Sequence, residues 1–566
     1  MFVKAHTASL AGIDALPVVV EATVSSGLGM YLVGLPDSAV KESQDRIRSA
    51  FAGCGFKMPG KRLVVNLAPA DVRKEGSAFD VPIAVAVLAA SEQIRAERLG
   101  DYMLTGELSL DGTVKPVKGV LPIAVAARDG GFRGVIVPVE NIPEAAVVEG
   151  LDVIGVETLR QAADFLDGTL AIAPAPHAIG EFSDDAGELY SEDFSDVKGQ
   201  GHVKRALEIA AAGGHNVIMI GSPGSGKTML ARRMPSIMPP MSLAEALETT
   251  KIHSVAGKLG SRKGLLSGRP FRAPHHLTSQ VALIGGGSNP QPGEVSLSHN
   301  GILFLDELPE FGRSVLEVLR QPMEDKRISV SRARYSVEYP ANFSLVASMN
   351  PCPCGYYNHP TKECVCGGGV VFRYLNRISG PLMDRIDLHI EVTPVPLAEI
   401  SSAAPAESSA EIRKRVIAAR RIQQARFADC EGVHTNAMMN SKMLRRFCPL
   451  SRESAAMLET AMERLSLSAR AWDRIIKVAR TIADLDAAAG ADYGGVDAPG
   501  AVGASASASA SASASASASA SDAAALGTAD PDVAPENAST MVPDITPAHI
   551  AEAINYRSLD RESWGR

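Results

Sequence analysis

A glycine-rich run containing one lysine and one threonine lies near the middle of the chain. It consists of Gly221, Ser222, Pro223, Gly224, Ser225, Gly226, Lys227 and Thr228. Glycines let backbone N–H groups surround phosphates, Lys227 can reach the β- and γ-phosphates, and Thr228 can offer its hydroxyl to Mg²⁺. Because an apolar strand pattern at 216–220 precedes the run and a helical pattern at 229–234 follows it, we predict a phosphate-binding loop for ATP and Mg²⁺ rather than a chance glycine-rich turn.

Two further apolar stretches end in residues that suit hydrolysis of a bound nucleotide. The stretch at 301–305 runs into Asp306, which would hold Mg²⁺ through water, and Glu307, which would polarise the attacking water. The stretch at 344–349 ends at Asn350, which could orient that water near the γ-phosphate. An Asn that simply opens a turn is the alternative for Asn350. The order of the three motifs along the chain favours the functional interpretation.

Four of the seven cysteines are bunched directly after Asn350: Cys352, Cys354, Cys364 and Cys366. Four thiolates so close in sequence can surround one Zn²⁺ tetrahedrally. Cysteines bunched in this way in an intracellular chain favour metal binding over a disulfide framework, although two loop disulfides are the alternative. We therefore predict a structural Zn²⁺ that pins the loop after Asn350.

The elements that must position these residues divide the 566-residue chain into regions, because so long a chain exceeds a single core. Apolar patterns predict strands at 63–67 and 135–139 and helices at 81–90 and 120–128, which indicates an α/β domain. We predict the following division: a first domain at 1–170, a Pro-containing acidic linker at 171–195, an α/β nucleotide-binding core at 196–395, a helical region at 396–490, a disordered Ala/Ser-rich insert at 491–541 and a last helix within 542–566.

The formal net charge of −8 excludes a global nucleic-acid-binding signature, so any contact with DNA must come from local basic groups. Two short β-like stretches at 328–330 and 336–339 suggest a hairpin flanked by Lys326, Arg327, Arg332 and Arg334. A second basic group, before the acidic strand, comprises Arg262, Lys263, Arg269, Arg272, His275 and His276. Either group could contact a phosphate backbone, and a solvated charged face is the alternative.

The chain begins without a secretory signal pattern, and its apolar runs are too short to cross a bilayer. We therefore expect a cytoplasmic protein without a membrane partner.

Five segments together resemble the YifB/ComM-type, magnesium-chelatase-like AAA+ ATPases, the competence protein ComM family; they lie at 269–276, 285–294, 299–311, 379–387 and 467–470. The resemblance covers nearly the whole chain and implies an α/β multidomain protein with a P-loop AAA+ core and a C-terminal helical lid. It implies that Arg385 is an arginine finger that reaches the γ-phosphate of a neighbouring subunit. It also implies that Arg470 is the sensor-2 arginine of the lid. A finger acting between subunits requires a ring, which we expect to be a homohexamer.

Residues 105–119, with 124–131 and 135–138 after them, resemble the Lon protease domain, which has the ribosomal S5 domain 2-like fold. Lon cuts peptides with a Ser–Lys pair, but alignment to this chain puts Ala78 and Leu121 at those positions. Ser77 and Lys118 lie nearby, shifted by one and three residues. A nucleophile needs its base within hydrogen-bond reach, so we predict a Lon-like domain that is inactive as a peptidase.

The resemblance to ComM implies an ATP-driven DNA helicase or branch-migration motor in recombination and natural transformation. In that reading Lys227, Glu307, Asn350, Arg385 and Arg470 are catalytic. A magnesium-chelatase-like or chaperone-like ATPase that remodels a protein partner is the alternative. The nucleotide motifs do not separate the two, but the Lon-like first domain and the basic hairpin favour DNA.

Overall fold

The computed structural model describes residues 2–177, 190–259, 264–287, 290–332, 335–357, 359, 361–395, 406–465, 467–490 and 543–557. The side chains at 331, 332, 335, 336, 368 and 490 are not among those described. Part of the predicted linker and all of the predicted Ala/Ser-rich insert lie outside these residues, so both stay predictions. Among the described helices, none is both long and apolar enough to cross a membrane.

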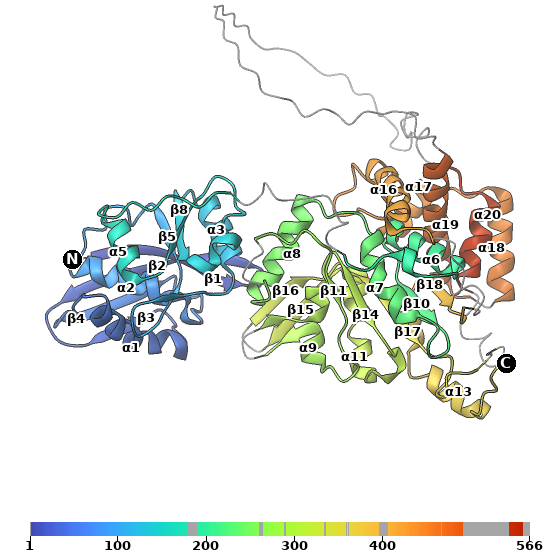
Figure 1. Ribbon diagram of the computed structural model, residues 1–566, viewed down its shortest axis with the longest axis horizontal. Coiled ribbons are helices and arrows are strands. Elements are labelled where there is room, and N and C mark those ends of the chain that lie inside the picture. Colours follow the sequence, from blue (N-terminus) through green and yellow to red (C-terminus); the bar gives the residue numbers. More distant parts are fainter. Residues whose placement is uncertain are drawn as a thin grey trace, which may run out of the picture.

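The first part of the chain forms a seven-stranded mixed sheet in the order β3-β4-β2-β1-β5-β8-β9 (Figure 1). Its strands are β1 (Phe2–Ala11), β2 (Asp14–Ser25), β3 (Met30–Val33), β4 (Arg62–Ala68), β5 (Tyr102–Leu104), β8 (Gly134–Pro138) and β9 (Asp152–Val156). The helices around it are α1 (Ser38–Gly53), α2 (Asp80–Ala90), α3 (Val120–Asp129), α4 (Ile142–Ala145) and α5 (Leu159–Leu166). Every residue of α2 is buried, because this helix lies inside the core of the unit. The predicted strands and helices of this region are confirmed within a residue or two.

The middle of the chain forms a five-stranded parallel sheet in the order β11-β14-β17-β10-β18. Its strands are β10 (Val217–Ile220), β11 (Phe271–Arg272), β14 (Ile302–Leu305), β17 (Ser344–Met349) and β18 (Leu388–Glu391). Strands β10, β14 and β17 are buried at every position, which is why they read as unbroken apolar runs. The helices near it are α6 (Gly201–Gly213), α7 (Lys227–Ile237) and α8 (Leu243–Val255), with the shorter α9 (Gln280–Ile284), α10 (Glu294–Leu297), α11 (Arg313–Glu317), α12 (Arg320–Asp325), α13 (Gly368–Leu375) and α14 (Gly380–Met383).

The predicted hairpin is present, and it is inserted in the chain between β14 and β17. Strands β15 (Arg327–Arg332) and β16 (Tyr335–Pro340) pair antiparallel, with Ile328 opposite Tyr339. The first unit packs against this hairpin and against α8, as Figure 1 shows for the blue and green parts of the ribbon. Lys251 of α8 pairs with Asp14 at 3.0 Å, and the Gly119 N–H donates to Ser254 O at 3.2 Å.

The last part of the chain is helical. It comprises α16 (Ser409–Arg426), α17 (Ser441–Phe447), α18 (Arg452–Arg464), α19 (Ala469–Gly490) and α20 (Pro547–Asn555). Helix α20 packs against α18 and α19, so the chain returns to the same helical core after residue 542. A buried ion pair between Arg426 and Asp484, with Nη2 and Oδ1 at 2.5 Å, joins α16 to α19.

Candidate nucleotide-binding site

The glycine-rich run forms a loop between β10 and α7, as predicted. Gly226 precedes the helix with a φ of +92°, a left-handed conformation that favours glycine. Helix α7 starts at Lys227, so its first N–H groups and its positive end face the loop. The hydroxyls of Ser222 and Ser225 are 6% and 4% exposed, and neither has a hydrogen-bond partner among the described residues. Buried hydroxyls in a loop of this form suit a phosphate ligand.

Lys227 reaches across the loop toward Asn350. Its Nζ donates to Gly221 O at 2.7 Å, to Ser222 O at 3.0 Å and to Asn350 Oδ1 at 3.2 Å. Burial lowers the pKa of Lys227, and the nearby carboxylates of Asp306 and Glu307 partly oppose that shift. A phosphate would compete for the same N–H bonds and would favour the charged form of the lysine.

Thr228 and Asp306 form the part of the site that suits Mg²⁺. The Thr228 hydroxyl donates to Asp306 Oδ2 at 2.8 Å, and the Ser348 hydroxyl is bonded to Asp306 Oδ1. Hydroxyl and carboxylate oxygens are the ligands that Mg²⁺ prefers in proteins, usually with several waters retained. The residues present therefore fit the predicted ion, with Ser348 orienting the carboxylate as an additional member of the site.

Glu307 has an unusual backbone conformation, with a φ of +53°. A non-glycine residue with positive φ is uncommon and is often found where function requires a particular orientation. Its carboxylate is 56% exposed, and Oε2 lies 3.6 Å from Nδ1 of His276. His276 belongs to the basic segment before β14, which sequence reasoning treated as a possible DNA contact. The pair of adjacent histidines was the signal, but nothing in the sequence linked it to Glu307.

Asn350 is held from two directions, by Lys227 and by α13. The hydroxyl of Tyr374 is hydrogen-bonded to the backbone of Asn350. Burial, with Glu310 nearby, raises the pKa of Tyr374 to about 12, so this hydroxyl stays protonated at neutral pH. Sequence reasoning did not single out Tyr374, because its role depends on a loop that brings α13 back to the end of β17.

Gln200 is a further site residue that sequence reasoning missed. It precedes α6 with a φ of +54°, and its Nε2 donates to Ser225 O at 2.8 Å and to Thr393 O at 3.1 Å. It therefore connects the phosphate-binding loop to the segment after β18. A cavity of about 460 Å³ opens beside the start of α6; it is lined by Gly199, Gly201, Lys204, Ala406, Ile412 and others. The only sequence signal was a Gln between two glycines at the start of a helix.

Comparison with known proteins identifies the family. The models "Magnesium chelatase, subunit ChlI", "Subunit ChlI of Mg-chelatase" and "Magnesium chelatase, subunit ChlI C-terminal" match residues 193–400, 20–141 and 406–494. YifB of Escherichia coli strain K12 is 46% identical over 485 residues, which are 85% of this chain and 93% of that protein. Competence protein ComM of Haemophilus influenzae is 45% identical over 477 residues, 84% of this chain and 92% of ComM. The chain belongs to the YifB/ComM family of magnesium-chelatase-like proteins.

The YifB/ComM assignment confirms the resemblance found in the sequence, and the matches fit an α/β multidomain AAA+ protein. AAA+ proteins of the magnesium chelatase family are generally ATPases. A shorter likeness extends to Lon protease 2 of Bacillus subtilis, which is 28% identical over 130 residues, or 22% of this chain.

The two arginines that the YifB/ComM resemblance implied lie in different surroundings. Arg385 is 5% exposed, and its Nη2 pairs with Glu324 Oε1 of the same chain at 2.6 Å. To reach a neighbouring subunit it must leave this pair, so the finger role stays a prediction. Arg470 is exposed in the first turn of α19. One turn later, Arg474 binds Asp387 at 2.8 Å and so connects α19 to the start of β18.

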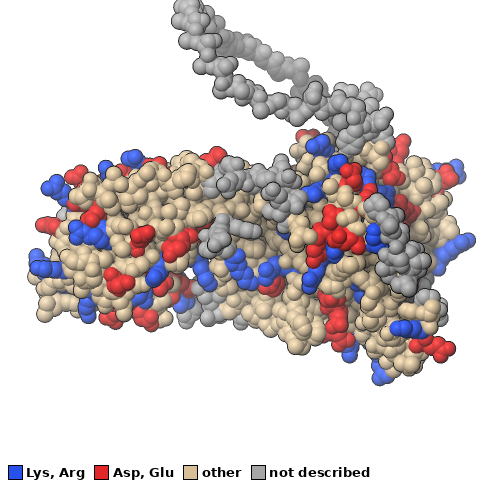
Figure 2. Space-filling view, viewed as in Figure 1, with Lys and Arg blue, Asp and Glu red and all other residues tan. Residues whose placement is uncertain are grey.

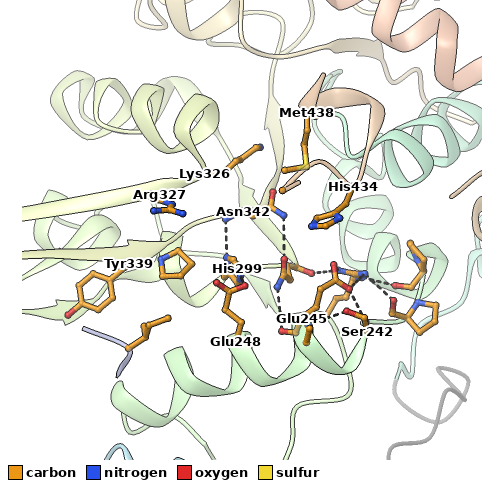
Figure 3. A pocket seen from close by; sticks show the side chains of 18 of the residues that line it. Ser242, Glu245, Glu248, His299, Lys326, Arg327, Tyr339, Asn342, His434 and Met438 are labelled. Carbon is orange, nitrogen blue, oxygen red and sulfur yellow. Dashed lines mark hydrogen bonds and ion pairs between the residues drawn. The ribbon is translucent and has the colours of Figure 1, made fainter. Parts of the chain in front are cut away.

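Of the four cations predicted to contact DNA, one is described as an exposed side chain. Arg327 is 70% exposed and pairs with Glu338 at 3.4 Å. Lys326 instead lies half-buried at the edge of a cavity of about 660 Å³, beside Asn342 (Figure 3). Burial lowers the pKa of Lys326 to about 8. The side chain of Arg332 and the whole of Arg334 lie outside the described residues.

Charge over the surface is mixed. Lys and Arg are interspersed with Asp and Glu on the face shown in Figure 2, without a broad area of one sign. Local cations must therefore provide any contact between this face and a phosphate backbone.

The four predicted cysteine ligands come together in one cluster. Their Sγ atoms all lie within 4.8 Å of one another, and all four are free thiols. In the first unit, the hydroxyl of Ser77 is bonded to Glu107, whereas Lys118 packs against Gly257 after α8. These contacts direct Ser77 and Lys118 toward different partners, in line with the prediction that the Lon-like unit is inactive as a peptidase.

Proposed function

We propose that this YifB/ComM-family protein hydrolyses ATP at the site between β10, β14 and β17. One observation carries the proposal: the ends of these parallel strands bring Lys227 to Asn350 and Thr228 to Asp306. Bound Mg²⁺ would bridge phosphate oxygens and offset their charge. Lys227 would bind the β- and γ-phosphates, Thr228 and Asp306 would hold the ion, and Glu307 would accept a proton from the attacking water while Asn350 orients it.

We further propose that several copies form a ring, with Arg385 and Arg470 completing the site between subunits. A homohexamer is the expected assembly. In this arrangement residues 1–170 form a Lon-like domain, 171–195 a linker, 196–395 the AAA+ core, and 396–490 with 542–566 a helical lid around the 491–541 insert. Release of Arg385 from Glu324 would be required before the finger could cross to a neighbour.

DNA is the proposed cargo, with helicase or branch-migration activity in recombination and natural transformation. Two observations support this choice: the hairpin is inserted between the strands that end at Glu307 and Asn350, and its relative ComM is named a competence protein. Arg327 is the described hairpin cation that could meet a phosphate backbone. A protein partner is the second candidate, supported by the magnesium chelatase matches along the chain and by the existing Arg327–Glu338 pair.

The test is to measure ATPase activity and strand displacement on forked and four-way DNA. Lys227→Ala and Glu307→Gln should abolish both activities, since one removes the phosphate cation and the other the base. Arg327→Ala should reduce DNA stimulation, whereas Arg313→Ala, at an exposed position on α11, serves as the matched control. Intact ATPase without binding, stimulation or unwinding of DNA would refute the DNA proposal and favour a protein partner.

A further inference from the structure

The segment that joins β17 to α13 has almost no apolar core. Between residues 353 and 370, none of the described hydrophobic side chains is buried, and Val365 is 86% exposed. Cys352, at the start of the segment, is fully buried. A stretch of chain this poor in core contacts needs another source of stability to keep one conformation, such as a disulfide or a metal.

The four thiols of this segment provide such a source. Cys352 Sγ lies 3.2 Å from Cys354 Sγ and 3.6 Å from Cys364 Sγ, and Cys366 completes the group. Backbone N–H groups of Tyr356 and Val365 are directed at Cys354 Sγ. Such N–H groups stabilise the thiolate, which is the form that binds metal.

The same segment is in contact with the phosphate-binding loop. The Gly355 N–H donates to Cys352 O at 2.9 Å, which closes a tight turn. Gly355 has a φ of +84°, and a Cβ added to it would lie only 2.4 Å from Cδ of Pro223. The backbone of the cysteine turn therefore rests directly on the Pro223 ring of the loop.

Both ends of the segment also meet at Asn350. Cys352 follows Asn350 by two residues, and the side chain of Asn350 accepts a bond from Lys227. At the far end, Tyr374 of α13 bonds back to the Asn350 backbone. A link among the four sulfurs would thus fix the position of Asn350 and Pro223 together.

We propose that Cys352, Cys354, Cys364 and Cys366 bind one structural Zn²⁺, and that this ion braces the phosphate-binding loop for nucleotide. Four thiolates at this spacing suit the tetrahedral preference of Zn²⁺, and all four positions are filled by the protein, as in structural sites. The metal site stands on the cysteine geometry alone. The brace rests on the proposed nucleotide function.

The metal site is tested by zinc and iron analysis of the full-length protein, purified without chelators or a metal-affinity step. The expected result is about one zinc per chain, as for a structural site with four protein ligands. Cys364→Ser should lose most of the zinc, whereas Cys430→Ser, at an isolated half-buried thiol, should retain it. Less than half a zinc per chain, iron in place of zinc, or two disulfides found by mass spectrometry of the unreduced protein would each overturn the site.

The brace is tested by titration with a fluorescent ATP analogue before and after a mercurial reagent releases the zinc. Removal should weaken binding about tenfold, and added zinc with reductant should restore it. Gly355→Ala should weaken binding about tenfold with zinc retained, because a Cβ there is strained and meets Pro223. Gly367→Ala is the control, since its Cβ would enter open space.

The two proposals fail in different ways. Zinc-loaded protein that binds the analogue equally well after zinc removal, and equally well as Gly355→Ala, would overturn the brace while leaving nucleotide binding intact. Zinc-loaded protein that binds no nucleotide would instead refute the proposed ATPase and the brace with it, and the metal analysis would still decide the site.

Discussion

Replacement of Asp387 by Asn should weaken the connection between the helical region and the parallel sheet. Asp387 precedes β18 and is 1% exposed. Its Oδ1 accepts from Arg474 at 2.8 Å, and its Oδ2 accepts from the Asn216 N–H at 2.9 Å. Burial alone would raise the pKa of this carboxyl, but the Arg474 guanidinium, His215 and the Asn216 N–H together lower it far below its ordinary value.

The size of the effect follows from which contacts survive. Breaking a buried ion pair by removing one charge costs about 3–5 kcal/mol. Asn keeps an oxygen for the Asn216 N–H, which retains about 1 kcal/mol. Arg474 is 19% exposed, so water can partly hydrate it once its partner is neutral. We therefore expect a loss of about 3 kcal/mol in the free energy of unfolding, or about 6–12 °C in the melting temperature of a unit of this size.

The pH dependence has a definite sign. Because the folded-state pKa of Asp387 is lowered, its stabilising contribution is present above the unfolded pKa and is lost as the pH falls below that value. Wild-type protein should therefore lose up to about 1.4 kcal/mol per pH unit from this residue below about pH 4. The Asn variant should lack this component.

The assay is thermal unfolding followed by near-UV circular dichroism at pH 7.5 and in steps from pH 5 to pH 3. Asp486→Asn is the control: this carboxyl of α19 is 50% exposed in its pair with Arg205, so its loss should cost under about 1 kcal/mol. An Asp387→Asn protein that melts within about 2 °C of wild type, or that keeps the wild-type response to acid, would refute the reasoning.

Three further predictions concern the nucleotide site. His276→Ala should lower the rate of ATP hydrolysis about tenfold, because Glu307 loses its orienting neighbour, while the analogue Kd stays within about twofold; a change confined to Kd would contradict this role. Gln200→Ala removes two hydrogen bonds that hold the loop, so the analogue should bind about tenfold more weakly, and unchanged affinity would exclude the connection. Because burial lowers the pKa of Lys227, it becomes neutral at a lower pH than free lysine, so ATP affinity should fall as the pH rises from 8 toward 10; a flat titration profile would contradict this expectation.

Much of the nucleotide site was predictable because parallel strands end at the same edge of a sheet. Each of the three central strands is an unbroken apolar run, so its end in the sequence is easy to locate. The polar residue after each run must then lie at the common edge, which places Lys227, Asp306 and Asn350 together without knowledge of the rest of the fold.

The residues that sequence reasoning missed reach the site by side-chain contacts between distant segments. Gln200 approaches from before α6, and Tyr374 approaches from α13 after a loop of irregular structure. Periodic patterns report which face of an element is buried, but not which distant element covers it. The same limit explains Lys326: a basic residue at the start of a hairpin suggested an exposed contact, yet its backbone, with a φ of +56°, directs the chain so that this side chain lies beside the cavity.

The hairpin and the catalytic residues lie at opposite ends of the same two strands, which gives the proposed motor a direct mechanical connection. Strand β17 begins just after the hairpin and ends at Asn350, and its six residues span about 20 Å. Asn342, at the hairpin base, donates its N–H to His299, which precedes β14 and hence Glu307. A shift of Asn350 on loss of the γ-phosphate would move a rigid, fully buried strand rather than a flexible loop. We therefore expect Asn342→Pro, which removes the His299 bond at the hairpin end, to reduce DNA-stimulated ATPase more than basal ATPase, and equal loss of both would contradict the coupling.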